Sequence, residues 1–312
     1  MTWNKVATIM WAVANLCLGS WQAPASAQDQ NPMLRENAAE KLSDHVYMLR
    51  GFPNVVIVVG KTATLIIDTG LGPRNGDVVA RTAAALAKTT KLFLTTTHFH
   101  PEHAAGEGGF PKGTILVRAR AQHEEMEQDN GATLSRFSIR RGGDAALLDS
   151  ALLEGVKYRK PDVIFDKRYD LDLGGVHARL IWAGPAHTRG DTEVFVKEDR
   201  VLVTGDVIHN KYGPVFAASG ITPRDWIRTI DALAQLHPKL IVPTHSLPGD
   251  GEDLIFAQRG FLVALDERAH ALKAAGTSAI DAGTIINAEM KARYPDWELH
   301  SLSNAVARVY AE

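Results

Sequence analysis

The feature that most constrains this chain is an apolar strand that ends in a cluster of histidines. Residues 92–97 form the apolar-to-threonine run LFLTTT, which leads directly into the hexapeptide HFHPEH. Because side chains alternate along an extended segment, His98 and His100 point to the same side and can reach one ion. The proline then redirects the chain, so Glu102 and His103 can face a second ion. This spacing predicts two adjacent metal sites at the end of one strand.

Two metal ions need further ligands, and three candidates follow apolar strands elsewhere in the chain. They are His187, Asp206 and His245, and each comes after a strand and a few small residues. Asp206 can bridge two ions with its two oxygens, which a histidine cannot do, and Gly205 lets the backbone come close. The alternative role for Asp206 is to start a turn at the end of its strand.

This set of residues resembles the metallo-β-lactamase superfamily of metallohydrolases. The resemblance covers the order and rough spacing of five motifs, from Ile66–Gly70, which contains Asp68, to Pro243–His245. It implies an α/β fold, the αβ/βα four-layer sandwich, in which two mixed β-sheets are flanked by helices and the metals lie at one edge. Strands that precede helices in both halves of the chain agree with that fold.

The resemblance also implies a role for each residue. By residue, His98, His100 and His187 would bind the first metal, His103 and His245 the second, and Asp206 would bridge the two. Asp68 would lie near the site, where it would orient a ligand histidine or order the metal-bound water. The alternative for Asp68 is a plain turn before Thr69 and Gly70.

Glu102 departs from the pattern of the superfamily, which usually has aspartate at this position. That aspartate ligates the second metal and accepts a hydrogen bond from the nucleophile. Glutamate is one methylene longer, so occupancy, metal preference or nucleophile alignment at the second site can differ. We predict that Glu102 is a ligand that takes part in catalysis, and the alternative is a general base beside a single metal.

The predicted activity is metal-dependent hydrolysis. Zinc lowers the pKa of bound water to about 7 and so supplies hydroxide at neutral pH, and two zinc ions are expected, with iron or manganese as alternatives. The expected substrate is a small ester, lactone, thioester or amide. Because Asp206 argues against a typical zinc β-lactamase, activity on β-lactams is only an alternative. Another alternative is a non-catalytic metal-binding or iron redox accessory protein.

Two further segments carry weaker signals. His209 and Tyr212 follow Asp206, and we predict that they contact the substrate if their loop covers the site; otherwise this is a solvent loop. His123-Glu124-Glu125 resembles part of a zinc-protease motif but lacks the second histidine, so a solvated helix face is expected.

The first 27 residues read as a secretory signal peptide. Lys5 precedes the apolar run Val6–Leu18, and small residues lead to Ala25-Ser26-Ala27. We therefore expect residues 28–312 to form a single domain that is periplasmic or secreted, without a membrane anchor. The chain's only cysteine, Cys17, lies in the predicted leader, so the mature protein cannot form a disulfide.

Composition limits the partners. Lys and Arg total 34 against 36 for Asp and Glu, and no block of like charge stands out, so we expect a small-molecule substrate and no nucleic acid. The sequence leaves the oligomeric state open.

The apolar pattern predicts strands over 55–59, 63–68, 92–96, 114–117, 178–182, 193–196, 201–204 and 240–243, and helices over 75–88, 121–128, 223–236, 254–274, 280–292 and 303–311.

Overall fold

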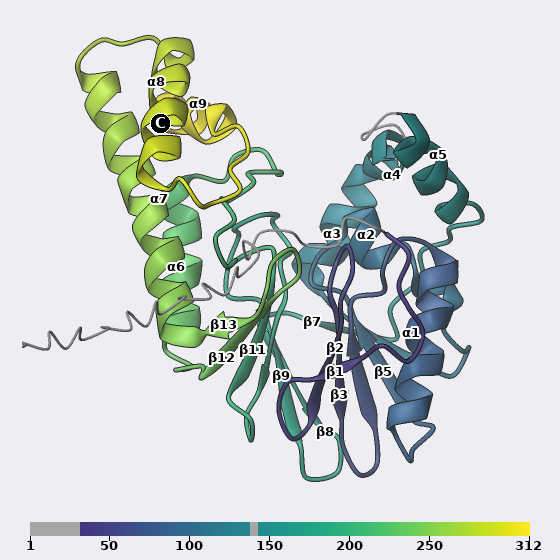
Figure 1. The fold of residues 1–312 in the computed structure, drawn as a ribbon. Coiled ribbons are helices and arrows are strands. Elements are labelled where there is room, and N and C mark those ends of the chain that lie inside the picture. The colour runs from purple at the N-terminus through teal and green to yellow at the C-terminus, as the bar shows by residue number, and fades with distance from the viewer. Residues whose placement is uncertain (1–31, 138–142) are drawn as a thin grey trace, which may run out of the picture.

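Two mixed β-sheets lie face to face in the computed structural model, which describes residues 32–137 and 143–312 (Figure 1). The first sheet runs β1 (Glu40–Lys41), β2 (Val46–Leu49), β3 (Val55–Val59), β4 (Thr64–Ile67), β5 (Leu92–Thr95), β6 (Ile115–Ala119) and β7 (Val163–Phe165). The second runs β13 (Gly249–Asp250), β12 (Leu240–Pro243), β11 (Val201–Gly205), β10 (Glu193–Val196), β9 (His177–Ile181) and β8 (Arg168–Asp172). The predicted signal peptide, residues 1–27, lies outside the described residues.

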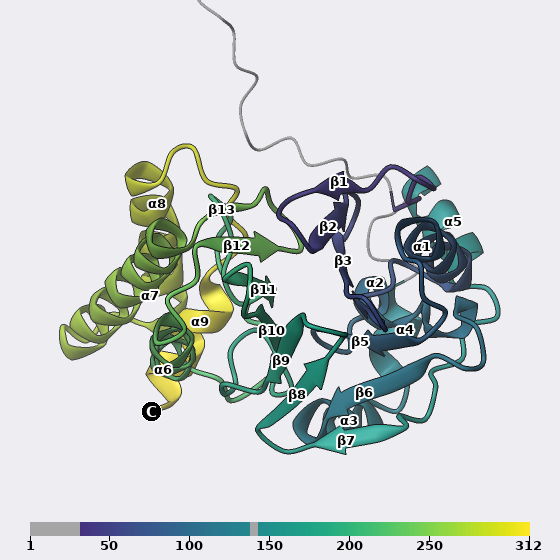
Figure 2. The same ribbon diagram turned by 90° about the horizontal axis from the view of Figure 1, so that it is seen from below.

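Helices cover the outer face of each sheet. On the side of the first sheet lie α1 (Pro73–Leu86), α2 (Pro101–Ala104), the short 3₁₀ helix η1 (Glu107–Gly109), α3 (Arg120–Asp129), α4 (Ala132–Phe137) and α5 (Gly143–Leu152). On the side of the second sheet lie α6 (Pro223–Ala234), α7 (Gly251–Ala274), α8 (Ala279–Arg293) and α9 (Ser303–Ala311). The view from below shows the sheets between these two helical groups (Figure 2). The predicted αβ/βα sandwich is therefore confirmed.

Alternating side chains explain the four layers. In β4, Leu65 and Ile67 pack between the sheets, whereas Ile66 packs outward in the cluster that contains residues of α1. In β11, Val203 packs between the sheets and Leu202 packs outward with residues of α6 and α7. Because β4 and β11 are buried on both faces, each reads as a continuous apolar run in the sequence.

Strand register brings the ends of distant segments together. The strands β4 and β5 are parallel with Ile67 opposite Thr95, so the residues after both strands emerge at the same edge. In the second sheet β11 and β12 are parallel, with Gly205 opposite Pro243. The polar residues that follow these four strands therefore gather at one edge of the sandwich.

Most predicted elements are confirmed. Both predicted hairpins exist, as β3–β4 and β10–β11, and each predicted helix corresponds to one of α1, α3, α6, α7, α8 and α9 within a few residues. The sequence did not predict β1, β2, β7, β8, β13, α2, α4 or α5. Within the part of the chain that the structure describes, none of the helices is long and apolar enough to cross a bilayer.

Trp226 in α6 ties the outer helices to the loop after β11. Its side chain is fully buried, and its Nε1 donates a hydrogen bond to the carbonyl of Val207 at 2.9 Å. We expect Trp226→Phe to lower the free energy of unfolding by about 1–3 kcal/mol, because the buried carbonyl loses its donor. Urea denaturation measures the change. The control is Trp182→Phe, which removes a hydrogen bond to Arg189 at an exposed position, and equal losses in both variants would contradict the argument.

Candidate metal centre

The predicted ligands converge at the carboxyl ends of four strands. His98 and His100 lie between β5 and α2, His187 follows β9, Asp206 follows β11 and His245 follows β12. All of these side chains are buried except that of His100, which is half-buried. Both sheets therefore contribute residues to one buried polar cluster.

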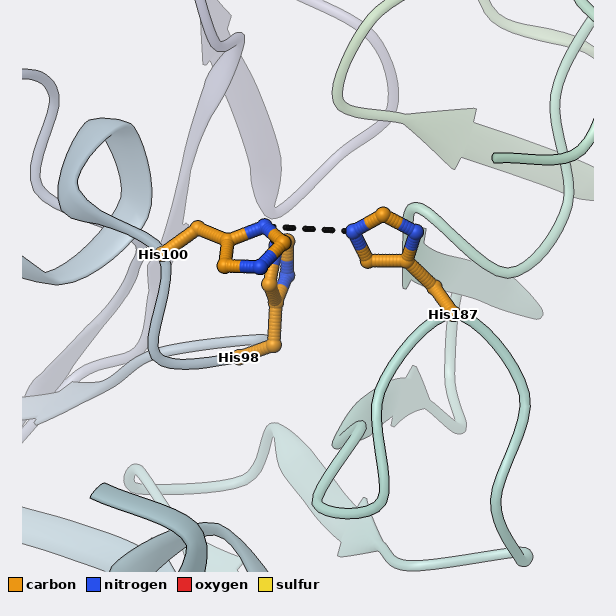
Figure 3. Close-up of side chains that lie close together, drawn as sticks. All are labelled: His98, His100 and His187. Atoms are coloured by element: carbon orange, nitrogen blue, oxygen red, sulfur yellow. Dashed lines mark hydrogen bonds between the residues drawn. The ribbon is translucent and has the colours of Figure 1, made fainter. Parts of the chain in front are cut away.

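Three imidazoles form the first group. The Nδ1 of His100 lies 3.0 Å from the Nε2 of His98 and 3.2 Å from the Nε2 of His187. Figure 3 shows the three rings meeting, with His187 approaching from a separate segment. Around a tetrahedral zinc ion with Zn–N bonds near 2.0–2.1 Å, nitrogen ligands lie about 3.3 Å apart. The spacing of the three nitrogens therefore fits a shared ion.

Glu102, His103 and His245 form the second group, and their ligand atoms all lie within 4.8 Å of one another. The Nε2 atoms of His103 and His245 are 3.2 Å apart. Glu102 lies in the first turn of α2 and is 3% exposed. The glutamate at this position is thus placed among the other candidate ligands of a second ion.

Asp206 lies between the two groups. Its Oδ2 is 3.5 Å from the Nε2 of His187, and its Oδ1 is 3.5 Å from the Nε2 of His245 and 3.8 Å from that of His103. The hydroxyl of Thr244 donates a hydrogen bond to Oδ1 at 2.5 Å. One carboxylate oxygen therefore faces each group, which is the geometry that a bridging ligand requires.

Hydrogen bonds fix the orientation of two of the histidines. The Nδ1 of His187 lies 2.6 Å from the carbonyl oxygen of Val215, and the Nδ1 of His103 lies 2.9 Å from the Oδ2 of Asp68. A proton on each Nδ1 leaves the lone pair on Nε2, which points into the cluster. Asp68 thus makes the contact expected of a residue that orients a ligand histidine.

The backbone of Asp68 adopts a conformation that few residues take. Its φ angle is 68°, in the left-handed region that is uncommon for residues other than glycine. The Oδ1 atom accepts a hydrogen bond from the backbone N–H of Thr97 at 2.6 Å, and Oδ2 accepts one from the Thr97 hydroxyl at 2.9 Å. These contacts hold the strained backbone in place, so Asp68 is more than a simple turn residue.

Burial and charge set the protonation of the cluster. Burial lowers the pKa of His98 well below its usual value and lowers that of His245 to about 3, so both rings are neutral. Burial opposes a charge on His103 as well, but the charge and hydrogen bond of Asp68 raise its pKa to about 9. Burial alone would raise the pKa of Asp206, yet the surrounding histidines hold it well below its usual range.

These donors fit a metal centre. Neutral imidazoles and ionised carboxylates are the ligands that zinc takes in proteins, and His103 joins them when metal binding displaces the proton on its Nε2. His98, His100 and His187 could hold one ion, and Glu102, His103 and His245 a second, with Asp206 between them. The structure brings all seven predicted ligands together.

Comparison with known proteins agrees with this geometry. Residues 48–245 match the family described as the metallo-beta-lactamase superfamily. The chain belongs to the metallo-β-lactamase superfamily. Members of the superfamily bind metal ions, and most are metal-dependent hydrolases.

Individual relatives are distant. The chain is 22% identical over 217 residues to the beta-lactamase-like protein 2 homolog of Caenorhabditis elegans, a match that covers 66% of this chain and 63% of that protein. The fold resembles that of the sec-alkylsulfatase Pisa1 from Pseudomonas sp., with a TM-score of 0.68, 18% identity, and coverage of 87% of this chain and 49% of that chain. It also resembles a metallo-beta-lactamase from Pontibacter korlensis, with a TM-score of 0.57, 19% identity, and coverage of 74% and 99%. At these identities the two structures show a shared fold.

His209 and Tyr212 take different places in this superfamily member. His209 is only 2% exposed and its Nε2 lies 4.0 Å from the Oδ1 of Asp206, so it belongs to the buried cluster and not to an open loop. Burial lowers its pKa to about 4. The half-buried ring of Tyr212 stacks on that of His245, with centroids 6.4 Å apart, and its hydroxyl lies 2.6 Å from the Nε2 of His300. His300 carries no sequence motif and was not predicted.

The prediction that Glu125 lies on a solvated helix face is wrong. Its carboxylate is buried and accepts hydrogen bonds from the backbone N–H groups of Arg189, at 3.1–3.2 Å, and Gly190, at 3.0 Å. Because these residues follow His187 directly, Glu125 fixes the loop that carries this ligand. Asp191 closes the same loop through the N–H and hydroxyl of Thr188.

Asn54 is a second supporting residue that sequence reasoning missed. Its buried Nδ2 donates hydrogen bonds to the carbonyls of Pro243, at 3.1 Å, and Ser246, at 2.9 Å. These two residues flank the segment that carries His245, so Asn54 holds it against the first sheet. The only signal in the sequence is a polar residue directly before the apolar strand β3.

Proposed function

We propose that this protein is an exported hydrolase that uses two zinc ions to cleave a small ester, lactone, thioester or amide in the periplasm. The observation that carries the proposal is the position of Asp206, with one carboxylate oxygen facing each group of candidate ligands. A bridging carboxylate is needed only where two ions are held side by side. Export rests on the signal-peptide pattern of the first 27 residues.

The chemistry divides between the metal and the protein. A zinc ion held by these residues would lower the pKa of water to about 7 and so would supply a nucleophile at neutral pH. The chain itself fixes the donors through Asp68 and the carbonyl of Val215, and it buries most of the cluster. Glu102 would take a proton from the nucleophile and return it to the leaving group.

Metal content and turnover together test this proposal. The mature chain is purified, its zinc, iron and manganese are quantified, and esters, lactones, thioesters, amides, β-lactams, phosphodiesters and sulfate esters are assayed with and without chelator. Two metal equivalents and chelator-sensitive turnover on one substrate class are expected. Metal-loaded protein that turns over no substrate would refute the hydrolase and favour the metal-binding alternative, and turnover that survives full metal removal would refute the role of zinc.

Glu102 offers a prediction within this proposal. We expect Glu102→Gln to lower kcat by at least about 100-fold, because an amide cannot act as a general base. Glu102→Asp restores the residue usual in the superfamily and should keep most of the activity. Steady-state kinetics on the best substrate measure both, with the exposed Glu124→Gln as the matched control. Unchanged kcat in Glu102→Gln would show that this residue does not act as a general base.

A further inference from the structure

A pocket of about 340 Å³ opens beside His100. Residues of α3 and α4, the loop after His187 and the segment 217–219 line it. Its volume falls at the small end of the range of pockets that bind small molecules, roughly 300–1,000 Å³. Because His100 is both a lining residue and a candidate metal ligand, a molecule in this pocket lies next to the metal centre.

The two carboxylates in the pocket wall are already engaged with the protein. Glu125 accepts the backbone N–H groups that follow His187. Asp129 accepts hydrogen bonds from the backbone N–H of Thr133 at 3.0 Å and from its hydroxyl at 2.6 Å. Donors of this chain therefore occupy part of the acceptor capacity of each carboxylate and fix its position.

The two arginines in the wall remain available. Arg136 is exposed, and among the described residues the hydrogen bond found for its guanidinium is one from Nη2 to the Thr133 hydroxyl at 3.3 Å. The side chain of Arg189 is 53% exposed, and its Nε lies 3.9 Å from Glu125, at the limit of an ion pair. Both guanidinium groups therefore keep donors for a ligand in the pocket.

We infer that this pocket is the specificity site of the enzyme and binds a carboxylate of the substrate between Arg136 and Arg189. The planar fork of arginine matches a carboxylate and forms charge-assisted hydrogen bonds with it. Phe99 supplies an apolar wall next to His100, which suits a short hydrocarbon between the carboxylate and the bond that is cleaved. This inference rests on the proposed function and narrows its substrate to small acidic esters, lactones, thioesters or amides.

A second hollow lies beside this pocket and differs from it in its arginines. It has a volume of about 400 Å³ and shares Glu125, Gln128 and Arg189 with the first pocket, but its wall includes Trp182 and not Arg136. An anion in that hollow would depend on Arg189 alone. An anion in the pocket beside His100 depends on both arginines, so Arg136 decides between them.

The test compares an acidic and a neutral substrate of similar size. The acidic probe is the 4-nitrophenyl monoester of glutaric acid, and the neutral probe is 4-nitrophenyl butyrate. We expect Arg136→Gln and Arg189→Gln each to raise KM for the acidic ester by roughly 10- to 100-fold, the effect of losing one charged hydrogen bond. KM for the neutral ester should not change, and Arg136→Lys should fall between glutamine and wild type. The exposed Arg168→Gln is the matched control.

A binding measurement separates this inference from the proposed function. Calorimetry with glutarate, and with the neutral glutaramide, needs no turnover. If the wild type turns over no substrate of the panel given under Proposed function but binds glutarate through both arginines, the proposed function fails and the anion pocket stands. If it cleaves both esters and the arginine variants act like wild type, the pocket is refuted and the hydrolase stands. An effect of Arg189→Gln alone would place the anion in the neighbouring hollow and overturn the inference.

Discussion

Replacing Asp206 with asparagine is expected to remove one of the two metal ions and at least about 100-fold of the activity, since even residues that only support ligands change metal affinity or activity by 10- to 100-fold. The carboxylate offers one oxygen to each group of histidines. Asparagine has a single oxygen, and its NH₂ group cannot bind a cation. The variant can therefore serve one group at most. Elemental analysis and kinetics with saturating zinc measure the two effects.

Thermal unfolding distinguishes a metal effect from damage to the fold. In wild type, added zinc should raise Tm, because an ion that binds only the folded state stabilises it by about 2.7 kcal/mol at 100 times its dissociation constant. Asp206→Asn should lose most of this zinc-dependent shift, measured for each protein against its own Tm in chelator. The control is the exposed Asp44→Asn. A variant that still binds two equivalents of zinc would show that Asp206 does not bridge.

Asp68→Asn is expected to weaken zinc binding by about 10- to 100-fold without touching a ligand. Asparagine tolerates the left-handed backbone at this position. If its oxygen accepts the hydrogen bond from the backbone N–H of Thr97, its NH₂ group donates to Nδ1 of His103. The proton of that ring must then lie on Nε2, the atom whose lone pair would bind the metal. If the amide flips, two donors face each other at Thr97. Competition with a chelating dye measures the affinity.

The metal-free proteins provide an independent readout of the same contact. Asp68 raises the pKa of His103 from its usual 6.5 to about 9, so the contact stabilises the fold fully below pH 6.5 and the stability is lost as pH rises through about 9. The difference in unfolding free energy between wild type and Asp68→Asn should therefore shrink over this range. The matched control is Asp199→Asn. Asp199 lies on the turn between β10 and β11, and its carboxylate contacts the ring of His45. Equal weakening of zinc binding in both variants would rule out a specific role for Asp68.

The candidate ligands could be predicted because each follows an apolar strand within a few residues. Parallel strands such as β4 and β5 end at the same edge of a sheet, and the sequence shows where each strand stops. The pattern of His98, His100 and His103 therefore carries its own geometry. Helices α6 and α7 could be predicted for a similar reason, since their apolar positions recur with helical period.

The supporting contacts could not be predicted because they join segments that are remote along the chain. Glu125 reaches the N–H of Arg189 across 64 residues, and Tyr212 meets His300 across 88. No local pattern encodes such pairs. The strand β8 was missed for another reason: its sequence RYDLD is largely polar, as suits a strand at the edge of a sheet.

The first group of histidines draws His98 and His100 from one sheet and His187 from the other. The valine-rich layer between the sheets, which includes Val203, therefore acts as a spacer that sets how far apart the coordinating nitrogens stand. Close-packed interiors transmit strain from one side to the other. A methyl group gained or lost in that layer thus changes the distance between the coordinating nitrogens at the edge of the sheets. Substitutions in the core of such a protein are therefore constrained by the geometry of the metal site as well as by stability.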